Sequence, residues 1–118
     1  MLYMKIVVDK EMSVNQLARA FNEAYPFLKI EVYYRGNEMS PDAFHTLNDI
    51  SSLKNPSVFI ISPAMTIEQI EQYFWDKLGL QVSVFRKVGN SWINTSFTNN
   101  WTLERQNDIG RNIYSAIV

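Results

Sequence analysis

The chain contains one pattern twice. Residues 12–17 (Met-Ser-Val-Asn-Gln-Leu) recur as residues 65–70 (Met-Thr-Ile-Glu-Gln-Ile), 53 residues later. Residues 28–33 recur as residues 80–85 once one residue is dropped, and both copies then reach a Gly-Asn pair. Self-similarity at a fixed spacing reveals architecture before it reveals function. The chain is therefore predicted to contain two copies of one structural unit.

Each copy predicts a strand, a helix and a second strand. Short β-branched runs at 5–8 and 58–61 predict two buried strands. Ser-x-x-Gln at 13–16 and Thr-x-x-Gln at 66–69 are capping boxes, which mark the start of a helix. Apolar residues follow each box at helical spacing, and alternation with a period of two then indicates a strand with one buried face.

Two β-α-β units in tandem are typical of the ferredoxin-like sandwich, an antiparallel sheet with two helices on one face. We therefore predict an α+β fold with a C-terminal hairpin strand and helix added to it. Two parallel β-α-β crossovers in one sheet would use the same elements in another strand order. We predict a single domain, 1–118, with repeat halves 4–37 and 57–90, a linker 38–56 and a C-terminal extension 91–118.

The linker contains the only histidine of the chain. Ser-Pro at 40–41 predicts a helix over about 41–50. On such a helix, Asp42 and Asp49 share the face of His45, which makes His45 a weak acid/base candidate. A solvated helix face with incidental charges explains the same pattern. One histidine and two carboxylates make a poor closed metal site, and we expect no metal and no cofactor.

The extension begins with a hairpin signal. Residues 88–91 (Val-Gly-Asn-Ser) predict a turn into an edge strand at 92–97. A helix over about 102–109 is then predicted to end at Gly110. The last residues, 113–118, fit either a strand or a docked tail.

Composition excludes several classes of protein. The chain is 47% hydrophobic with a net charge of −1, so it has no overall positive field for a nucleic-acid backbone. The absence of cysteine excludes disulfides and thiolate chemistry. Lys5 interrupts the apolar N-terminal run, and no apolar stretch reaches the roughly 18 residues of a membrane span. We expect a cytoplasmic protein.

The predicted sheet has one face without helices. At its centre lie Lys5, Val7, Val58 and Ile60, and an apolar centre with a charged rim is typical of a surface that becomes covered. Residues of the extension or a second copy of the chain could cover it. RNA-recognition domains stack bases on aromatics of their central strands. Tyr33 and Phe85 are predicted on outer strands, which argues against RNA or DNA binding.

Aromatic residues break the symmetry of the repeat. Tyr73 and Trp75 stand where the first helix has Ala20 and Asn22. Such residues either bind a partner or pack the extension. The predicted interaction surface is Tyr33, Arg35, Tyr73, Trp75, Phe85, Trp92 and Trp101.

The sequence shows no catalytic constellation. It contains no Gly-rich phosphate loop, no Gly-x-Ser-x-Gly and no His-Glu-x-x-His. Glu104 and Asp108 are explained by a polar helix face. We expect a non-enzymatic protein-interaction or self-association domain, with a homodimer or another protein as partner. The alternative is a small-molecule sensor or small enzyme with a pocket between sheet and extension, using His45, Tyr33 or Arg35.

Two stretches carry a resemblance to known sequences. They are Val-Phe-Arg-Lys-Val-Gly-Asn-Ser-Trp at 84–92 and Asn-Trp-Thr-Leu-Glu-Arg-Gln-Asn at 100–107. The chain resembles, over about 65–107, an uncharacterised family of small bacterial proteins, mainly in Bacteroidetes. The segment 38–56 is shorter than the resemblance implies. The resemblance implies kinship and carries no reaction, ligand or functional residue.

Overall fold

The same order of elements occurs in both halves of the chain. The computed structural model describes residues 5–117, so the predicted limits at Met4 and Val118 lie outside the described residues. The first half contains β1 (Ile6–Val8), α1 (Val14–Ala24), β2 (Leu28–Tyr34), β3 (Asn37–Glu38) and α2 (Leu47–Ile50). The second contains β4 (Phe59–Ile61), α3 (Ile67–Tyr73) with the π-helical turn η1 (Phe74–Leu78), β5 (Gln81–Val88), β6 (Ser91–Asn94), the 3-10 turn η2 (Ser96–Thr98) and α4 (Leu103–Ile117).

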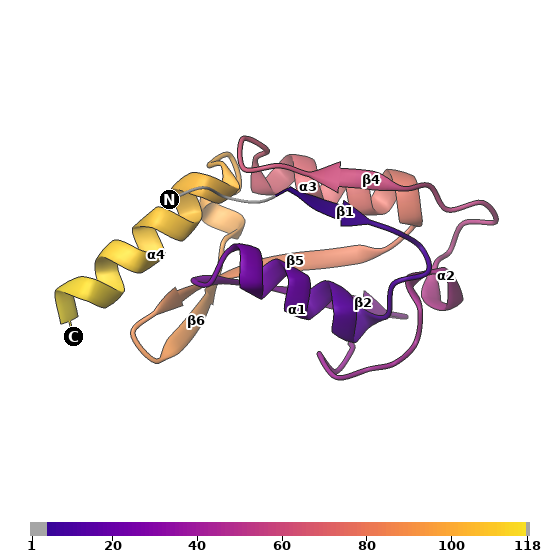
Figure 1. Ribbon diagram of the computed structural model, residues 1–118, viewed down its shortest axis with the longest axis horizontal. Helices are drawn as coiled ribbons and strands as arrows, with labels where there is room; N and C mark the ends of the chain where they lie inside the picture. Colours follow the sequence, from indigo (N-terminus) through magenta and orange to yellow (C-terminus); the bar gives the residue numbers. More distant parts are fainter. Residues whose placement is uncertain (1–4, 118) are drawn as a thin grey trace.

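The strands form two antiparallel sheets. β1 pairs with β4 in a two-stranded sheet, and a four-stranded sheet has the order β3-β2-β5-β6 (Figure 1). The α+β class is confirmed, whereas the single ferredoxin-like sheet is not. A strand has only two edges, and β2 pairs with β5 and β3 while β5 pairs with β2 and β6. The hairpin strands β3 and β6 take part of the outer edges of β2 and β5, and β1 and β4 pair with each other in a separate sheet.

A pseudo-two-fold axis relates the halves. In the short sheet, Val8 pairs with Phe59 and Ile6 pairs with Ile61. Val8 and Ile61 hold equivalent positions in the two copies, as do Ile6 and Phe59. Exchanging the copies therefore reproduces the same pairs. In Figure 1, α2 and α4 accordingly lie at opposite ends of the long axis of the molecule.

The duplication includes the segments that the sequence placed outside it. Isolated bridges join the cap residue Ser13 to Thr46, ahead of α2, and Thr66 to Thr102, ahead of α4. The capping boxes predicted at Ser13 and Thr66 are confirmed, and Thr46 begins a third. The repeated unit is thus β-α-β-β-α. The linker and the extension are its closing elements.

The helix predicted over 41–50 is wrong in its first half. Only Leu47–Ile50 is helical. The carbonyl of Ala43 accepts from the N–H of Asn15 at 3.0 Å, and the residues before Thr46 thus serve the free donors at the start of α1. In a helix over these residues, the carbonyls would accept from N–H groups of that same helix and would not be available to α1.

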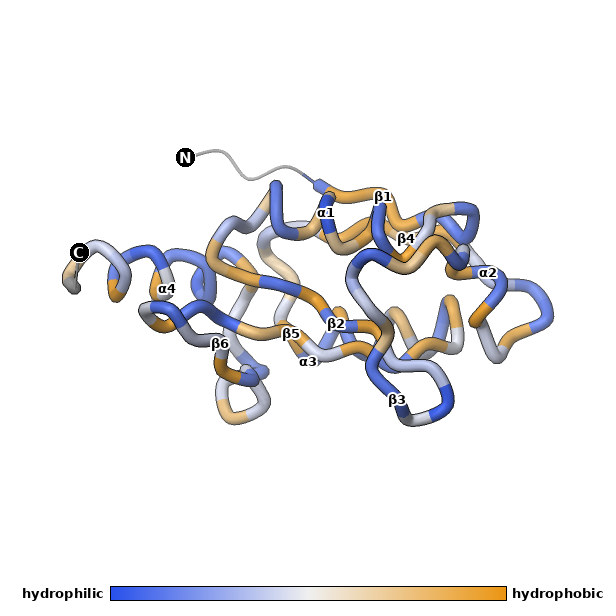
Figure 2. The backbone as a smooth tube through the Cα atoms, turned by 90° about the horizontal axis from the view of Figure 1, so that it is seen from below, coloured by the Kyte–Doolittle hydropathy of each residue, from blue (hydrophilic) through white to orange (hydrophobic). Residues whose placement is uncertain are grey.

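The predicted apolar faces form the core. Val14, Leu17 and Phe21 of α1 are buried, as are Ile67 and Ile70 of α3. Figure 2 shows apolar residues concentrated along β1, β4, β2 and β5, whereas α4 is mainly hydrophilic. The inward residues of both long strands, Leu28, Ile30, Val32, Val82 and Val84, are at most 4% exposed.

The C-terminal helix is longer than predicted. It passes through Gly110 and ends at Ile117. Gly110 is needed for close approach, because a Cβ there would lie 2.8 Å from the Cβ of Phe27. The strand predicted over 92–97 ends at Asn94. Among the described residues, no helix combines the length and apolar character required to cross a bilayer.

Candidate functional site

Three residues of the predicted interaction surface share one face. Tyr33, Phe85 and Trp92 lie on the side of the four-stranded sheet opposite its inward residues. The strands β2 and β5 are central in this sheet, so placing Tyr33 and Phe85 on outer strands was wrong. The Lys29 ammonium lies over two of these rings, with its Nζ 5.3 Å from the centroids of both Phe85 and Trp92. The same Nζ lies 3.1 Å from Oε1 of Glu31.

The other four predicted residues lie elsewhere. Arg35 sits in the β2–β3 turn with a φ of 52°. A hollow of about 450 Å³ is lined by Arg35 and Trp75 together with Tyr33, so three of the predicted residues meet there. Tyr73 stacks on Phe59 at 5.8 Å between ring centroids. Trp101 lies against the opposite end of the sheet. The seven residues therefore do not form one surface.

Trp101 packs the extension onto the repeat. Its ring lies 4.0 Å from the guanidinium carbon of Arg105 and 5.7 Å from that of Arg86. Nη1 of Arg86 donates to Oε1 of Gln106 at 2.8 Å, and burial lowers the pKa of Arg86. The fully buried Asn107 accepts from the backbone N–H of Phe27 at 2.8 Å. Five residues of the stretches that carry the resemblance therefore take part in packing the extension.

The predicted acid/base group at His45 has no structural basis. His45 is exposed and precedes α2, so no helical face joins it to Asp42 and Asp49. The Asp49 carboxylate instead accepts from the backbone N–H of Thr46 as part of the cap. Within residues 5–117, no group of three or more histidine or acidic side chains could hold a metal ion.

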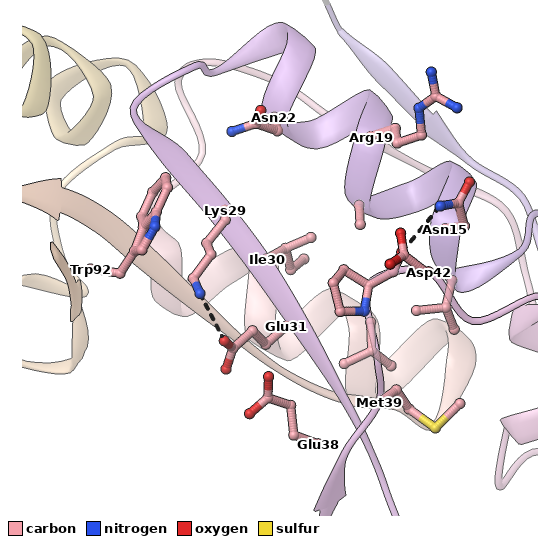
Figure 3. A pocket seen from close by; sticks show the side chains of 14 residues that line it. Asn15, Arg19, Asn22, Lys29, Ile30, Glu31, Glu38, Met39, Asp42 and Trp92 are labelled. Carbon is pink, nitrogen blue, oxygen red and sulfur yellow. Dashed lines mark hydrogen bonds and ion pairs between the residues drawn. The ribbon is translucent and has the colours of Figure 1, made fainter. Parts of the chain in front are cut away.

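A groove of about 550 Å³ lies beside β2. We call it the α1–β2 groove. Figure 3 shows its two walls, with Asn15, Arg19 and Asn22 on α1 and Lys29, Ile30 and Glu31 on β2. Neither this groove nor the hollow at Trp75 is lined by α4. The remaining lining residues are Val14, Ala18, Val32, Glu38, Met39, Pro41, Asp42 and Trp92.

The backbone of Ile30 faces this groove. Residues of a strand direct their N–H and C=O groups alternately to its two edges. The carbonyl of Phe27 accepts from Lys87 of β5, so the odd-numbered residues of β2 face β5. The carbonyl of Val32 accepts from Met39 on the opposite side. The N–H and C=O of Ile30 point to that opposite side, where no described residue bonds to them.

Hydrogen bonds close the groove at both ends. At one end, Nδ2 of Asn22 donates to the carbonyl of Leu28 at 2.9 Å. At the other, Nδ2 of Asn15 donates to the carbonyl of Pro41 at 3.3 Å. The open part of the strand edge is therefore short and centred on Ile30.

Charges are arranged unevenly along the groove. Lys29 and Glu31 form an ion pair at one side. Arg19 also lines the groove, and Figure 3 shows its guanidinium directed away from Glu38 and Asp42. Glu38 and Asp42, near β3, are exposed and form no ion pair with a described residue. The β3 end is therefore acidic, while Val32 and Met39 supply apolar surface between the walls.

The equivalent region of the second copy carries bulkier side chains. Glu71 stands in place of Ala18, and Trp75 in place of Asn22. The carboxyl of Glu71 is half-buried, and desolvation, followed by repulsion from Glu68, raises its pKa. The prediction drawn from the repeat used only the added rings of Tyr73 and Trp75 and did not include the pair Ala18 and Glu71. The small residues of the first helix were the missed signal for a groove.

Comparison with known proteins gives no relative. No family model, curated protein or solved structure matches the chain. The resemblance to small bacterial proteins stays a prediction.

Proposed function

We propose that the chain is a non-enzymatic protein-interaction domain that binds an extended segment of a partner protein in the α1–β2 groove. The observation that carries the proposal is the open backbone of Ile30. Backbone N–H and C=O groups of a strand edge are matched by the backbone of another extended chain, and peptide recognition commonly uses this pairing. Ile30 itself is 4% exposed, and buried backbone groups need partners.

The walls of the groove fit a short peptide. Ala18 leaves room beside the strand, and Val32 and Met39 offer apolar contact. Glu38 and Asp42 favour a basic side chain at the β3 end of the bound segment. The hydrogen bonds of Asn22 and Asn15 limit the paired stretch to a few residues. These features support a weak, reversible complex.

Nucleic-acid binding is less well supported than peptide binding. The rings of Phe85 and Trp92 already contact Lys29, which is neutralised by Glu31. Base stacking would require Lys29 to move off both rings. A small molecule in the α1–β2 groove would leave the backbone groups of Ile30 without partners unless it carried a matching donor and acceptor.

A random-peptide phage library panned against the whole chain tests the proposal. We expect enriched peptides to bind the wild type and to lose at least about tenfold in affinity for Ala18→Tyr, which fills the groove. The matched control is Ala116→Tyr, at an exposed position of α4. Methylating the peptide nitrogens one at a time should weaken binding at alternate positions, since only every second N–H faces β2.

Two results would contradict the proposal. The first is that no library peptide distinguishes Ala18→Tyr from Ala116→Tyr. The second is an N-methyl scan without alternation, which would show that the peptide is not held as a strand.

A further inference from the structure

The two-stranded sheet presents an apolar outer face. Val7, Val58 and Ile60 are 53–56% exposed. The sequence placed these residues at the centre of an uncovered sheet face, and their exposure is confirmed. Within residues 5–117, β1 pairs with β4 alone, so its other edge is unpaired. An exposed, unpaired strand edge is a template for another strand.

Charges flank β1 in the sequence. Lys5 directly precedes the strand and Asp9 directly follows it. If the alternation of side chains continues for one residue beyond each end of the strand, both charges share the face of Val7. Four residues of extended chain separate the two charges by about 13 Å, too far for an ion pair. Neither forms an ion pair with a described residue. Within the described part of the chain, the Asp9 carboxylate accepts from the backbone N–H of Glu11, at 2.9 Å.

We propose that a second copy of the chain pairs with β1, antiparallel and centred on Val7. This register places Val7 opposite its own counterpart. It also places Lys5 of each copy opposite Asp9 of the other, which produces two ion pairs. Opposite charges directly across an antiparallel pair stabilise it. The result is a four-stranded sheet with the order β4-β1-β1-β4 and a two-fold axis, a closed arrangement.

The other edges fit a second copy less well. Pairing β4 with itself about Ile60 would place Val58 opposite Ser62, with no opposite charges. Pairing β1 with β4 of another copy would not close and would lead to filaments. The edge of β1 is therefore the one at which a symmetric pair has charge complementarity.

The contact is small. Edge pairing of such a short strand falls below the roughly 1,200 Å² of a standard protein interface, so the dimer is expected to be weak and dependent on concentration. It lies on β1, whereas the α1–β2 groove lies along β2. The dimer therefore does not rest on the proposed peptide binding.

Sedimentation equilibrium of the full chain tests the dimer through charge reversal. We expect Lys5→Asp and Asp9→Lys each to lower the association constant about tenfold, because each converts both ion pairs into repulsions. The double variant Lys5→Asp with Asp9→Lys should restore association to within about twofold, since it reverses both pairs. Lys54→Asp, an exposed residue outside the strands, is the matched control.

A second variant tests whether the dimer can be lost without local unfolding. Val7→Lys changes an exposed side chain and would place two ammonium groups opposite each other, so it should abolish the dimer while circular dichroism stays unchanged. A strict monomer at about 0.5 mM wild-type chain would overturn the proposal. A dimer would also overturn it if the double variant failed to recover or if Lys5→Asp behaved like Lys54→Asp.

Discussion

His45 and Trp101 occupy the same place in the two halves of the chain. The carbonyl of His45 accepts from the N–H of Val14 at 3.0 Å, and that of Trp101 accepts from the N–H of Ile67 at 3.2 Å. In each half, the loop before the last helix serves the free donors at the start of the first. The backbone of His45 thus has a structural role that does not depend on its side chain, whereas the equivalent residue Trp101 also packs through its ring.

The two capping boxes should contribute equally to stability. Ser13→Ala and Thr66→Ala each remove a hydroxyl that accepts from the third residue of a helix, at 3.0 and 3.2 Å. We expect each to lower the free energy of unfolding by about 1 kcal/mol. Urea denaturation measures this, with Ser115→Ala, exposed on α4, as control. A cost at only one site would contradict the structural equivalence.

Asn107 should anchor the extension. Asn107→Ala leaves the backbone N–H of Phe27 without its 2.8 Å acceptor, and we expect a loss of about 1–3 kcal/mol. Asn112→Ala, exposed on the same helix, should be nearly neutral. Equal effects of the two variants in denaturant titrations would show that α4 is not held by this bond.

Replacing Gly110 by alanine should destabilise the protein, although the same replacement usually stabilises a helix. Alanine is better than glycine in a helix interior by about 1 kcal/mol. At Gly110, however, the new Cβ would lie 2.8 Å from the Cβ of Phe27, and overpacking typically costs about 1–3 kcal/mol. We expect a lower thermal midpoint for Gly110→Ala. A higher midpoint would mean that α4 can move away from β2 at little cost.

Glu71 should make stability depend on pH. Because burial raises the pKa of its carboxyl above the ordinary 4.5, the folded state binds more protons there than the unfolded state. The contribution of Glu71 is therefore most favourable below pH 4.5 and falls as pH rises through the folded pKa. Glu71→Gln should match the wild type near pH 4 and be more stable at pH 7.

The control for this prediction is Glu23→Gln, an exposed residue of α1. Thermal unfolding followed from pH 4 to pH 7 should show no growing difference between Glu23→Gln and the wild type. A Glu71→Gln variant that loses stability toward pH 7 would contradict the burial of this carboxyl.

Local signals in the sequence predicted most of the elements. The capping boxes at Ser13 and Thr66 located two helices, because cap chemistry depends on residues within one turn. Alternation located β2 and β5, and Gly89-Asn90 located the second hairpin. The first hairpin escaped detection because Arg35 takes a positive φ at a turn position where Asn or Gly is usual.

Strand order and the groove could not be predicted in this way. The pairing of β1 with β4 joins strands from the two halves of the chain, and this is a long-range property. The groove depends on Ala18 standing beside an edge that β3 leaves uncovered at Ile30. The equivalence of Thr46 and Thr102 was hidden because α2 has four residues and α4 has fifteen.

Hydrogen exchange at the amide of Ile30 tests the open strand edge most directly. In the free protein, we expect this amide to exchange much faster than those of Lys29 and Glu31, whose N–H groups face β5, although the Ile30 side chain is buried. A peptide selected for the α1–β2 groove should then slow exchange at Ile30 and leave its two neighbours unchanged. Protection of Ile30 equal to theirs in the free protein would contradict the account.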